Sequence, residues 1–281
     1  VDKGGNRCHR SQAAYAPLLV LGKPLTLDFR ACSGAVIDDV LVRDQRKDPL
    51  VAKQVPGPLG EDVTLVTLSI GGNDLGFADL LGHCARPWRL KCFESDKPFK
   101  DGLSPAEWVE RELARMPERL KSVYEGVRAA APTARILVLG YPFLFPEGNL
   151  ALNDPSCIAA RGLWNKGERQ AVRNYEARLN ETVATATAGV AEYVDTAAAF
   201  IGHEPCGKDR DWVEPGRVKG GKVFEGSFHP NATGQEAFAR LVACHLFVRP
   251  AVVGVEPPAP SPDLAEDVFD DAVEECLAAA A

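Results

Sequence analysis

The stretch VTLVTLSIGGNDLGF, residues Val63 to Phe77, decides the fold of this 281-residue chain. Its first eight residues form a nearly continuous apolar and β-branched run, which predicts a parallel strand, covered on both faces, that ends at Ile70. Gly71 and Gly72 then allow a sharp turn and a close approach to a ligand. Ligands of open α/β sheets bind beyond the carboxyl ends of the strands, so Asn73 stands where its amide could meet a carbonyl oxygen. Asn73 could instead cap the next helix, because asparagine accepts hydrogen bonds from the N–H groups at a helix start.

Two other turns are predicted at the same edge of the sheet. Residues 25–31 alternate apolar and polar side chains, which predicts a short strand running into the turn at Gly34, and residues 36–42 continue as a helix. His229 lies in a turn directly before the last predicted helix. A backbone donor at Gly34, an amide at Asn73 and an imidazole at His229 are what acyl transfer needs, namely donors for the developing oxyanion and a base for a serine nucleophile.

The rest of the chain alternates helices and strands, which is typical of an α/β fold with a parallel sheet. Ser104 and Glu107 form a capping box, with Pro105 at the first helical position, and predict the start of a long helix. The apolar loop Pro142 to Pro146 either lines an acyl pocket or covers core. We expect helices at about residues 11–21, 105–131, 167–188 and 231–247, strands at 135–141 and 190–195, and a long loop at 201–228.

The charge pattern separates a body from a tail. The chain has 32 Lys and Arg residues against 39 Asp and Glu residues, but no Lys or Arg follows Pro250, where acidic residues are frequent. The body is therefore nearly neutral, and the sequence has no basic stripe for nucleic acid, no apolar run that could span a membrane and no internal repeat. We expect one domain at residues 1–248, a Pro-rich linker at 249–262 and an acidic amphipathic tail at 263–281, which either docks or stays solvated.

The cysteines favour disulfides over a zinc site, because no C-x-x-C pair occurs. They are Cys8, Cys32, Cys84, Cys92, Cys157, Cys206, Cys244 and Cys276. Disulfides indicate an oxidising compartment, so we expect a secreted protein. No signal peptide precedes Val1, which means either that processing removed an export signal or that the sequence begins partway into its gene. If the acidic tail docks, Cys276 could pair with Cys244.

These features together resemble the SGNH (GDSL-type) hydrolases, in particular the secreted lipase and esterase branch of actinomycetes. The motifs that carry the resemblance are CHRSxxxY from Cys8, ACSGA from Ala31, IGGNDLGF from Ile70, GYP from Gly140, GHxxC from Gly202 and FHPN from Phe228.

The resemblance implies a three-layer, flavodoxin-like α/β fold and a carboxylic-ester hydrolase that uses no metal and no cofactor. It implies Gly34 and Asn73 as oxyanion donors and His229 as the general base, acting on a small-molecule or lipid ester in a secreted monomer. His203 is expected to be structural. Three disulfides are also implied, joining Cys8 to Cys32, Cys84 to Cys92 and Cys157 to Cys206.

The chain departs from the family in two places. Many relatives have Asp three residues before the base, where this chain has Gly226, so we expect a backbone carbonyl near Gly226 to orient the imidazole, with Glu225 as the other candidate. The Gly-Asp-Ser turn of the nucleophile and its central strand are absent, and Ser33 and Ser69 are no substitutes because they stand beside other turns. We therefore expect a sequence truncated at its N-terminus and inactive as given. The alternative is an inactive SGNH-fold binding or scaffold protein.

Overall fold

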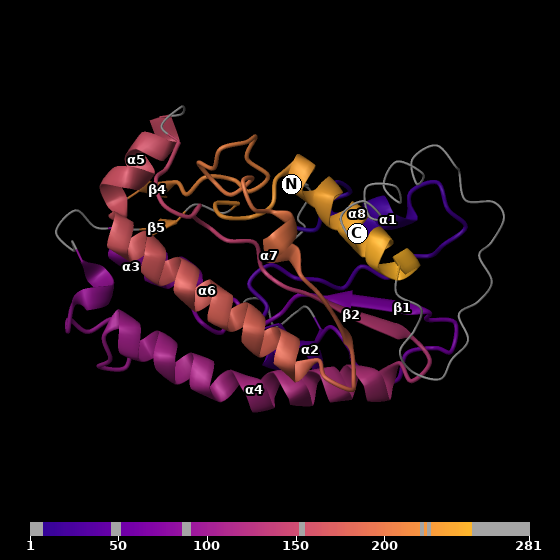
Figure 1. Ribbon diagram of the computed structural model, residues 1–281. Helices are drawn as coiled ribbons and strands as arrows, with labels where there is room; N and C mark the ends of the chain where they lie inside the picture. Colours follow the sequence, from indigo (N-terminus) through magenta and orange to yellow (C-terminus); the bar gives the residue numbers. More distant parts are fainter. Residues whose placement is uncertain are drawn as a thin grey trace.

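The computed structural model describes residues 8–45, 52–85, 91–151, 155–219, 222–223 and 226–248 (Figure 1). Its main sheet consists of the parallel strands β1 (Leu65–Leu68), β2 (Arg135–Leu139) and β3 (Glu192–Val194), in that order across the sheet. Because all three strands run in the same direction, the turns that follow them lie at one edge.

Helices cover both faces of this sheet (Figure 1). On one face α4 (Pro105–Ala130) packs against α6 (Lys166–Ala186) and α2 (Asp38–Leu41), and on the other α1 (Tyr15–Val20) packs against α8 (Ala232–Val248). The shorter elements are α3 (Phe77–Cys84), η1 (Cys92–Glu94), α5 (Pro155–Leu163), α7 (Thr196–Ala199), β4 (Val218–Lys219) and β5 (Lys222–Val223).

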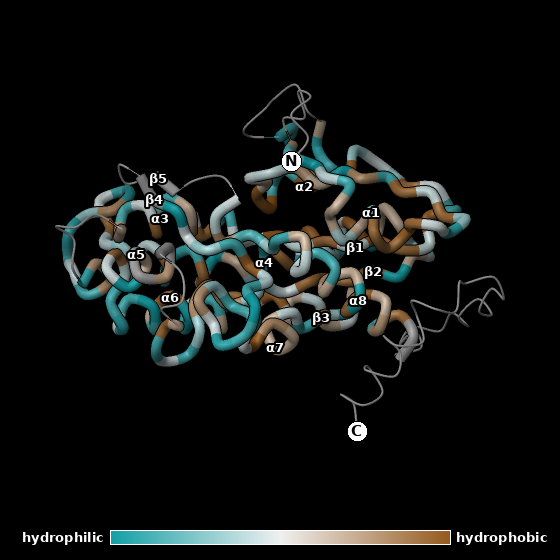
Figure 2. The backbone as a smooth tube through the Cα atoms, turned by 90° about the horizontal axis from the view of Figure 1, so that it is seen from above, coloured by the Kyte–Doolittle hydropathy of each residue, from teal (hydrophilic) through white to brown (hydrophobic). Residues whose placement is uncertain are grey.

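The side chains of β2 show why three layers form. Successive residues of a strand point to opposite faces. Ile136 and Val138 belong to the core beneath α4 and α6, whereas Leu137 and Leu139 belong to the core beneath α8. Figure 2 shows hydrophobic stretches along the middle of the molecule around β1 and α1, and hydrophilic ones in the outer loops near α5. The predicted three-layer α/β fold is confirmed.

Two of the helices whose starts are described, α4 and α6, begin at capping boxes. Ser104 and Glu107 form the predicted one, in which the Ser104 N–H donates to the Glu107 carboxylate at 2.8 Å, and α4 starts at Pro105 as expected. Asn165 and Glu168 form a second box at the start of α6. Each box satisfies backbone donors that a helix start leaves unpaired.

The strand predicted at residues 25–31 is wrong, because this segment is irregular. The side chains of Leu25 and Leu27 are 56% and 37% exposed. Strand β1 is also shorter than predicted and only half-buried, since it ends at Leu68 instead of Ile70. Both corrections have one physical reason. Within the described residues, no strand pairs with the side of β1 that faces away from β2. Residues 25–31 and the end of the predicted strand at 69–70 therefore lack the hydrogen-bonded partner strand that their patterns anticipate.

Other boundaries also differ from expectation. The helix predicted from Ser11 begins at Tyr15, because the Ser11 hydroxyl accepts from the Ala13 N–H and closes a local turn. Helices α5 and α7 were not predicted, nor was the β4–β5 hairpin inside the expected loop. The linker and the tail at 249–281 lie outside the described residues.

Three disulfides join cysteines within the described residues, and they are the three that the family resemblance implies. They join Cys8 to Cys32, Cys84 to Cys92 and Cys157 to Cys206. Cys276 lies outside the described residues, so its pairing with Cys244 stays a prediction. Among the described helices, none has the length and apolar character needed to cross a membrane.

Candidate functional site

The turn containing Asn73 and the turn containing His229 lie at the same edge of the sheet. Asn73 follows the carboxyl end of β1. At the opposite edge, Arg135 at the start of β2 donates to the carbonyl of Leu246, near the end of α8, at 3.0 Å. Helix α8 therefore runs back along the strands, and about 25 Å of helix separates its two ends. Its beginning, with His229 three residues before it, lies towards the carboxyl edge.

The turn at Gly34 is joined directly to the turn at Asn73. The Asn73 amide, through Nδ2, donates to the carbonyl of Ala35 at 3.0 Å. In the other direction, the Ile37 N–H donates to the carboxylate of Asp74, also at 3.0 Å. Gly34 has a φ of 77°, a conformation that favours glycine. The structure thus joins the turns of Gly34 and Asn73 by two hydrogen bonds, whereas the approach of His229 to them stays a prediction.

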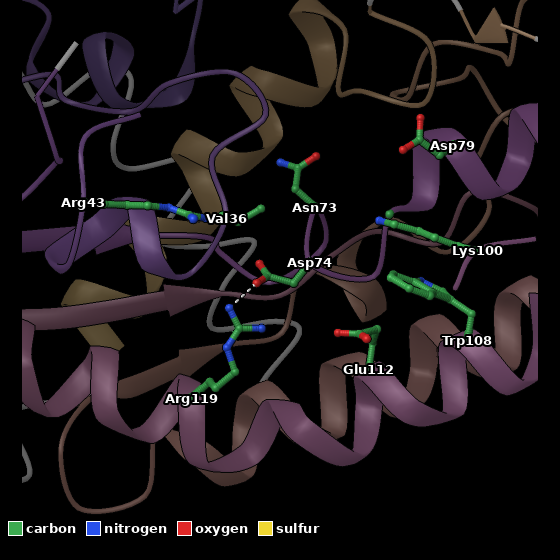
Figure 3. Close-up of a pocket in the computed structure, with 10 residues that line it drawn as sticks. Val36, Arg43, Asn73, Asp74, Asp79, Lys100, Trp108, Glu112 and Arg119 are labelled. Atoms are coloured by element: carbon green, nitrogen blue, oxygen red, sulfur yellow. Dashed lines mark ion pairs between the residues drawn. The ribbon is translucent and has the colours of Figure 1, made fainter. Parts of the chain in front are cut away.

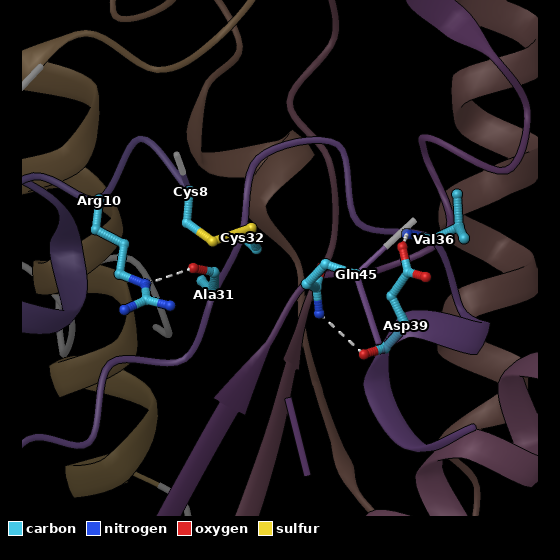
Figure 4. Close-up of a disulfide and its surroundings, with 7 residues drawn as sticks. All are labelled: Cys8, Arg10, Ala31, Cys32, Val36, Asp39 and Gln45. Carbon is cyan, nitrogen blue, oxygen red and sulfur yellow. Dashed lines mark hydrogen bonds between the residues drawn. A yellow bond between two sulfur atoms is a disulfide. The ribbon is translucent and has the colours of Figure 1, made fainter. Parts of the chain in front are cut away.

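A disulfide holds the segment that leads into the Gly34 turn (Figure 4). Cys32, two residues before Gly34, is bonded to Cys8. Beside this bond, Arg10 donates through Nε to the carbonyl of Ala31 at 2.9 Å. The segment that leads into the turn is therefore held by covalent and polar contacts, although it is not a strand.

The two glycines before Asn73 are required by their surroundings. Gly71 has a φ of 117°, which a residue with a side chain rarely adopts. A Cβ on Gly72 would lie 3.0 Å from the ring of Tyr141, whose hydroxyl accepts from the Gly72 N–H at 3.0 Å. Helix α3 is preceded by Gly76 with no side-chain cap, so the alternative role of Asn73 as a helix cap is wrong. Its exposed amide keeps one N–H beyond the bond to the turn at Gly34.

A backbone carbonyl holds the imidazole of His229. Nδ1 lies 2.8 Å from the carbonyl oxygen of Ser227. A carbonyl oxygen can only accept, so Nδ1 carries the hydrogen and Nε2 presents a lone pair in the neutral ring. The sequence predicts a carbonyl near Gly226, and the one found belongs to the next residue. Glu225, the other predicted partner, lies outside the described residues.

The loop before His229 is anchored to a neighbouring segment. Phe228 donates its N–H to the carbonyl of Glu214, and Glu214 donates its own N–H to the carbonyl of His229, both at 2.9 Å. His203 lies in the segment before Trp212, and its ring stacks on the Trp212 ring with ring centres 3.7 Å apart. Its Nδ1 lies 2.8 Å from the carbonyl of Arg210, an arrangement that suits the structural role expected for it.

A pocket of about 210 Å³ opens beside Asn73 (Figure 3). Six of its lining side chains are charged, three of each sign, and Asp74 forms an ion pair with Arg119 at 2.8 Å. The pocket is lined by Val36, Arg43, Asn73, Asp74, Gly76, Asp79, Lys100, Trp108, Glu112 and Arg119. Such walls suit polar groups better than an acyl chain. Across the described residues, no cluster of His, Cys, Asp or Glu has the arrangement of a metal site.

The apolar loop at 142–146 covers core at its most hydrophobic position. Phe145 is 2% exposed and packs against Trp164 and Phe228, with ring centres 5.6 and 5.8 Å away. The carboxylate of Glu176 accepts from the Leu144 N–H at 3.2 Å, and burial raises the pKa of Glu176 to about 8. The loop was predicted either to line an acyl pocket or to cover core, and Phe145 covers core.

Sequence reasoning missed three residues that shape this edge. Asp74 stands in the IGGNDLGF motif and Tyr141 in the GYP motif, but no pattern assigns them a role. Arg119 lies within α4, far along the chain from the turns that it contacts. Only its ion pairs reveal the connection.

Comparisons with known proteins agree with this architecture. The chain matches the GDSL-like Lipase/Acylhydrolase family over residues 2–237. It is 33% identical to Lipase 1 of Streptomyces coelicolor over 231 residues, which cover 81% of this chain and 73% of that protein. It is 31% identical to a lipase of Streptomyces rimosus, covering 83% of this chain and 75% of that protein.

Two solved structures of Streptomyces enzymes are similar to this chain along most of its length. The phospholipase A1 from Streptomyces albidoflavus NA297 superimposes with a TM-score of 0.65 at 34% identity, covering 86% of this chain and 89% of that one. The extracellular lipase from Streptomyces rimosus superimposes with a TM-score of 0.62 at 26% identity, covering 86% and 90%.

Proposed function

Because this chain belongs to the GDSL-like lipase and acylhydrolase family, a family of acyl-ester hydrolases, we propose that it cleaves carboxylic esters by a Ser-His dyad. The observation that carries this proposal is the pairing of His229 with the carbonyl of Ser227 at 2.8 Å. That contact leaves Nε2 as a base for a hydroxyl without any acidic side chain. The carbonyl takes the orienting role that an aspartate has in a triad.

The proposed reaction has two halves. A serine hydroxyl attacks the ester carbonyl carbon and gives its proton to Nε2 of His229, and the tetrahedral intermediate then expels the alcohol, which takes that proton. A water molecule repeats the sequence on the acyl-enzyme, and the carboxylic acid leaves. The backbone N–H of Gly34 and the remaining N–H of the Asn73 amide stabilise the negative oxygen in both halves.

The attacking serine is proposed to come from outside residues 1–281, since no serine in them stands in a Gly-Asp-Ser turn. The serines beside the site support this. Ser227 is buried, with its hydroxyl accepting from the Arg217 N–H at 3.1 Å. Ser69 is hydrogen-bonded to the hydroxyl of Tyr141. Ser33 belongs to the turn that would supply the oxyanion donor.

The substrate class and location are part of the same proposal. Lipases and a phospholipase A1 among the similar proteins favour lipid esters. Three disulfides, together with an extracellular lipase among the relatives, favour secretion. We expect a monomer that binds no nucleic acid.

Hydrolysis of p-nitrophenyl butyrate tests the proposal. Residues 1–281 alone should show no turnover, whereas the chain together with the segment that its gene encodes upstream should be active. In that longer chain, His229→Ala should lower kcat by about 10³-fold and Asn73→Ala by about 10²-fold. His203→Ala is the matched control, because its ring is stacked and hydrogen-bonded away from the proposed base.

Each outcome is informative. A folded but inert longer chain would favour the binding or scaffold alternative. Turnover by residues 1–281 alone that depends on His229 would overturn the proposed source of the serine. Full activity of the His229 and Asn73 variants would overturn the dyad itself.

A further inference from the structure

We propose that Asp74 and Arg119 are positioning residues for ester hydrolysis, holding the turns that carry Gly34 and Asn73 at the separation that one carbonyl oxygen requires. The inference rests on the proposed function. It concerns two residues outside the proposed catalytic set.

The side chain of Asp74 is built into the junction between the two turns (Figure 3). It is 3% exposed. One carboxylate oxygen accepts from the Ile37 N–H at 3.0 Å, and the other forms the 2.8 Å ion pair with Arg119. Each carboxylate oxygen of Asp74 therefore contacts a different part of the fold. One contacts the segment after Gly34, and the other contacts α4.

Arg119 extends the junction to a rigid support. Its guanidinium also lies 3.2 Å from the carboxylate of Asp38 in α2. One side chain of the long helix α4 therefore contacts both the Asn73 turn and the helix that follows the Gly34 turn. A guanidinium suits this position because its planar fork can contact two carboxylates at once.

The oxyanion donors depend on this junction because they sit on separate turns. Only two hydrogen bonds run directly between these turns among the described residues, namely Asn73 to Ala35 and Ile37 to Asp74. The first involves a proposed catalytic side chain itself. The second is therefore the contact that holds the spacing without using a group that also binds the oxyanion. A displacement of about 1 Å in such a site can cost about 100-fold in rate.

Charge makes the junction sensitive to substitution. Burial raises the pKa of Asp74, and the Arg119 guanidinium opposes that rise. Removing the guanidinium leaves a buried carboxylate without its counter-charge, which is costly in proteins. The carboxyl group can relieve that cost by taking up a proton or by moving towards solvent, and either change alters the contact that holds the turn beside Asn73.

The test measures kcat and KM for p-nitrophenyl butyrate with the active, longer chain. Asp74→Asn keeps the shape of the side chain but places an amide against the guanidinium, and Arg119→Gln removes the charge. Each should lower kcat by about 10- to 100-fold and change KM less than threefold, because a positioning contact acts on the transition state. Arg119→Lys keeps one charge and should recover part of the loss.

Two further variants separate positioning from general damage. Arg115→Gln on the same helix is the matched control, since Arg115 is 61% exposed and its one ion pair within the described part of the chain is with Glu112, so its kcat should stay within twofold of the parent. The double variant Asp74→Asn with Arg119→Gln should lose less than the product of the two single losses, because the two residues share one ion pair. Circular dichroism checks that each variant is folded, and should Asp74→Asn fail to fold, the Arg119 series decides alone.

The inference and the proposed function fail in different ways. If the Arg119 variants keep kcat within twofold while Asn73→Ala is nearly inactive, the positioning role is wrong and the dyad stands. If Asn73→Ala is itself fully active, the proposed function is wrong. A loss in Arg119→Gln that Arg119→Lys does not relieve at all would also contradict a role for the charge.

Discussion

The hydroxyl of Tyr141 is one of the groups that hold the turn presenting Asn73. This hydroxyl accepts from the Gly72 N–H at 3.0 Å. The backbone of Tyr141 is held by the side chain of Asn180, which accepts from the Tyr141 N–H and donates to the Tyr141 carbonyl, both at 2.8 Å. A second buried tyrosine, Tyr124, has a hydroxyl with no hydrogen-bond partner among the described residues. Replacing each tyrosine with phenylalanine should therefore affect stability differently, because only the Tyr141 hydroxyl is hydrogen-bonded.

We predict that Tyr141→Phe lowers the free energy of unfolding by about 1–3 kcal/mol, because it leaves the buried Gly72 N–H without an acceptor. Tyr124→Phe removes a hydroxyl that makes no hydrogen bond, and should leave stability unchanged or raise it by up to about 1 kcal/mol. Urea unfolding followed by circular dichroism measures both. A loss in Tyr141→Phe no larger than that in Tyr124→Phe would contradict the prediction.

At the scale of elements, the capping box of α4 connects a short motif to a helix of 26 residues. Ser104→Ala removes the acceptor for the Glu107 N–H and should destabilise the protein by about 1 kcal/mol. Ser104→Asp keeps an oxygen at the cap and is the control, expected to retain most of the stability. Urea unfolding measures the difference, and an alanine variant as stable as the aspartate variant would contradict the prediction.

Helix α6 carries a second element-scale prediction through Glu176. Its pKa is raised to about 8 by burial, while the nearby Arg173 opposes that rise and Glu204 adds to it. The unfolded chain releases this proton near pH 4.3, so between about pH 4.3 and 8 the native state holds a proton that the unfolded state has lost. Glu176 therefore contributes stability that is complete at the acid end of this window and is lost as the pH rises through about 8.

Glu176→Gln removes this proton linkage while keeping an acceptor for the Leu144 N–H. We predict that wild-type stability decreases relative to the variant between pH 5 and 8, by at most about 1.4 kcal/mol per pH unit. Urea unfolding at several pH values measures this. Glu181→Gln, an exposed change on the same helix, is the control and should follow the wild type. Parallel curves for the wild type and the Glu176 variant would sink the prediction.

At the scale of the whole molecule, the disulfides differ in the length of chain that they close. Cys157 and Cys206 are 49 residues apart and tie α5 to the loop that runs beside the His229 turn, whereas Cys84 and Cys92 are 8 apart. Chain entropy predicts that replacing both partners with alanine costs about 4 kcal/mol for the long loop and about 2.5 kcal/mol for the short one. Urea midpoints of the two variants measure the order, and a larger loss for the short loop would refute the entropic account here.

Much of the fold could be predicted because its signals are local. The apolar pattern of β2 and the capping box before α4 depend only on neighbouring residues, and both elements lie where expected. The segment at 25–31 shows the limit of such signals. Its alternation is typical of a strand, but a strand also needs a partner for its backbone groups, and the described residues supply none.

The candidate site divides in the same way. Gly34, Asn73 and His229 could be singled out from the sequence because each stands in a turn shortly before a predicted helix, and the carbonyl beside His229 was expected within one residue of where it lies. The roles of Asp74 and Arg119 could not, since an ion pair between residues 45 positions apart leaves no periodic trace in a single sequence.

The sequence by itself determined the layered α/β class, the three disulfides through the family resemblance, and the identity of the turns where chemistry is expected. These follow from side-chain pattern and backbone preference, which act over a few residues. Only the tertiary structure decided that Asn73 is not a helix cap, that Phe145 covers core, and that a buried carboxylate joins two turns to α4. Burial and pairing between distant segments depend on how the layers pack, and that information appears only when the whole chain is folded.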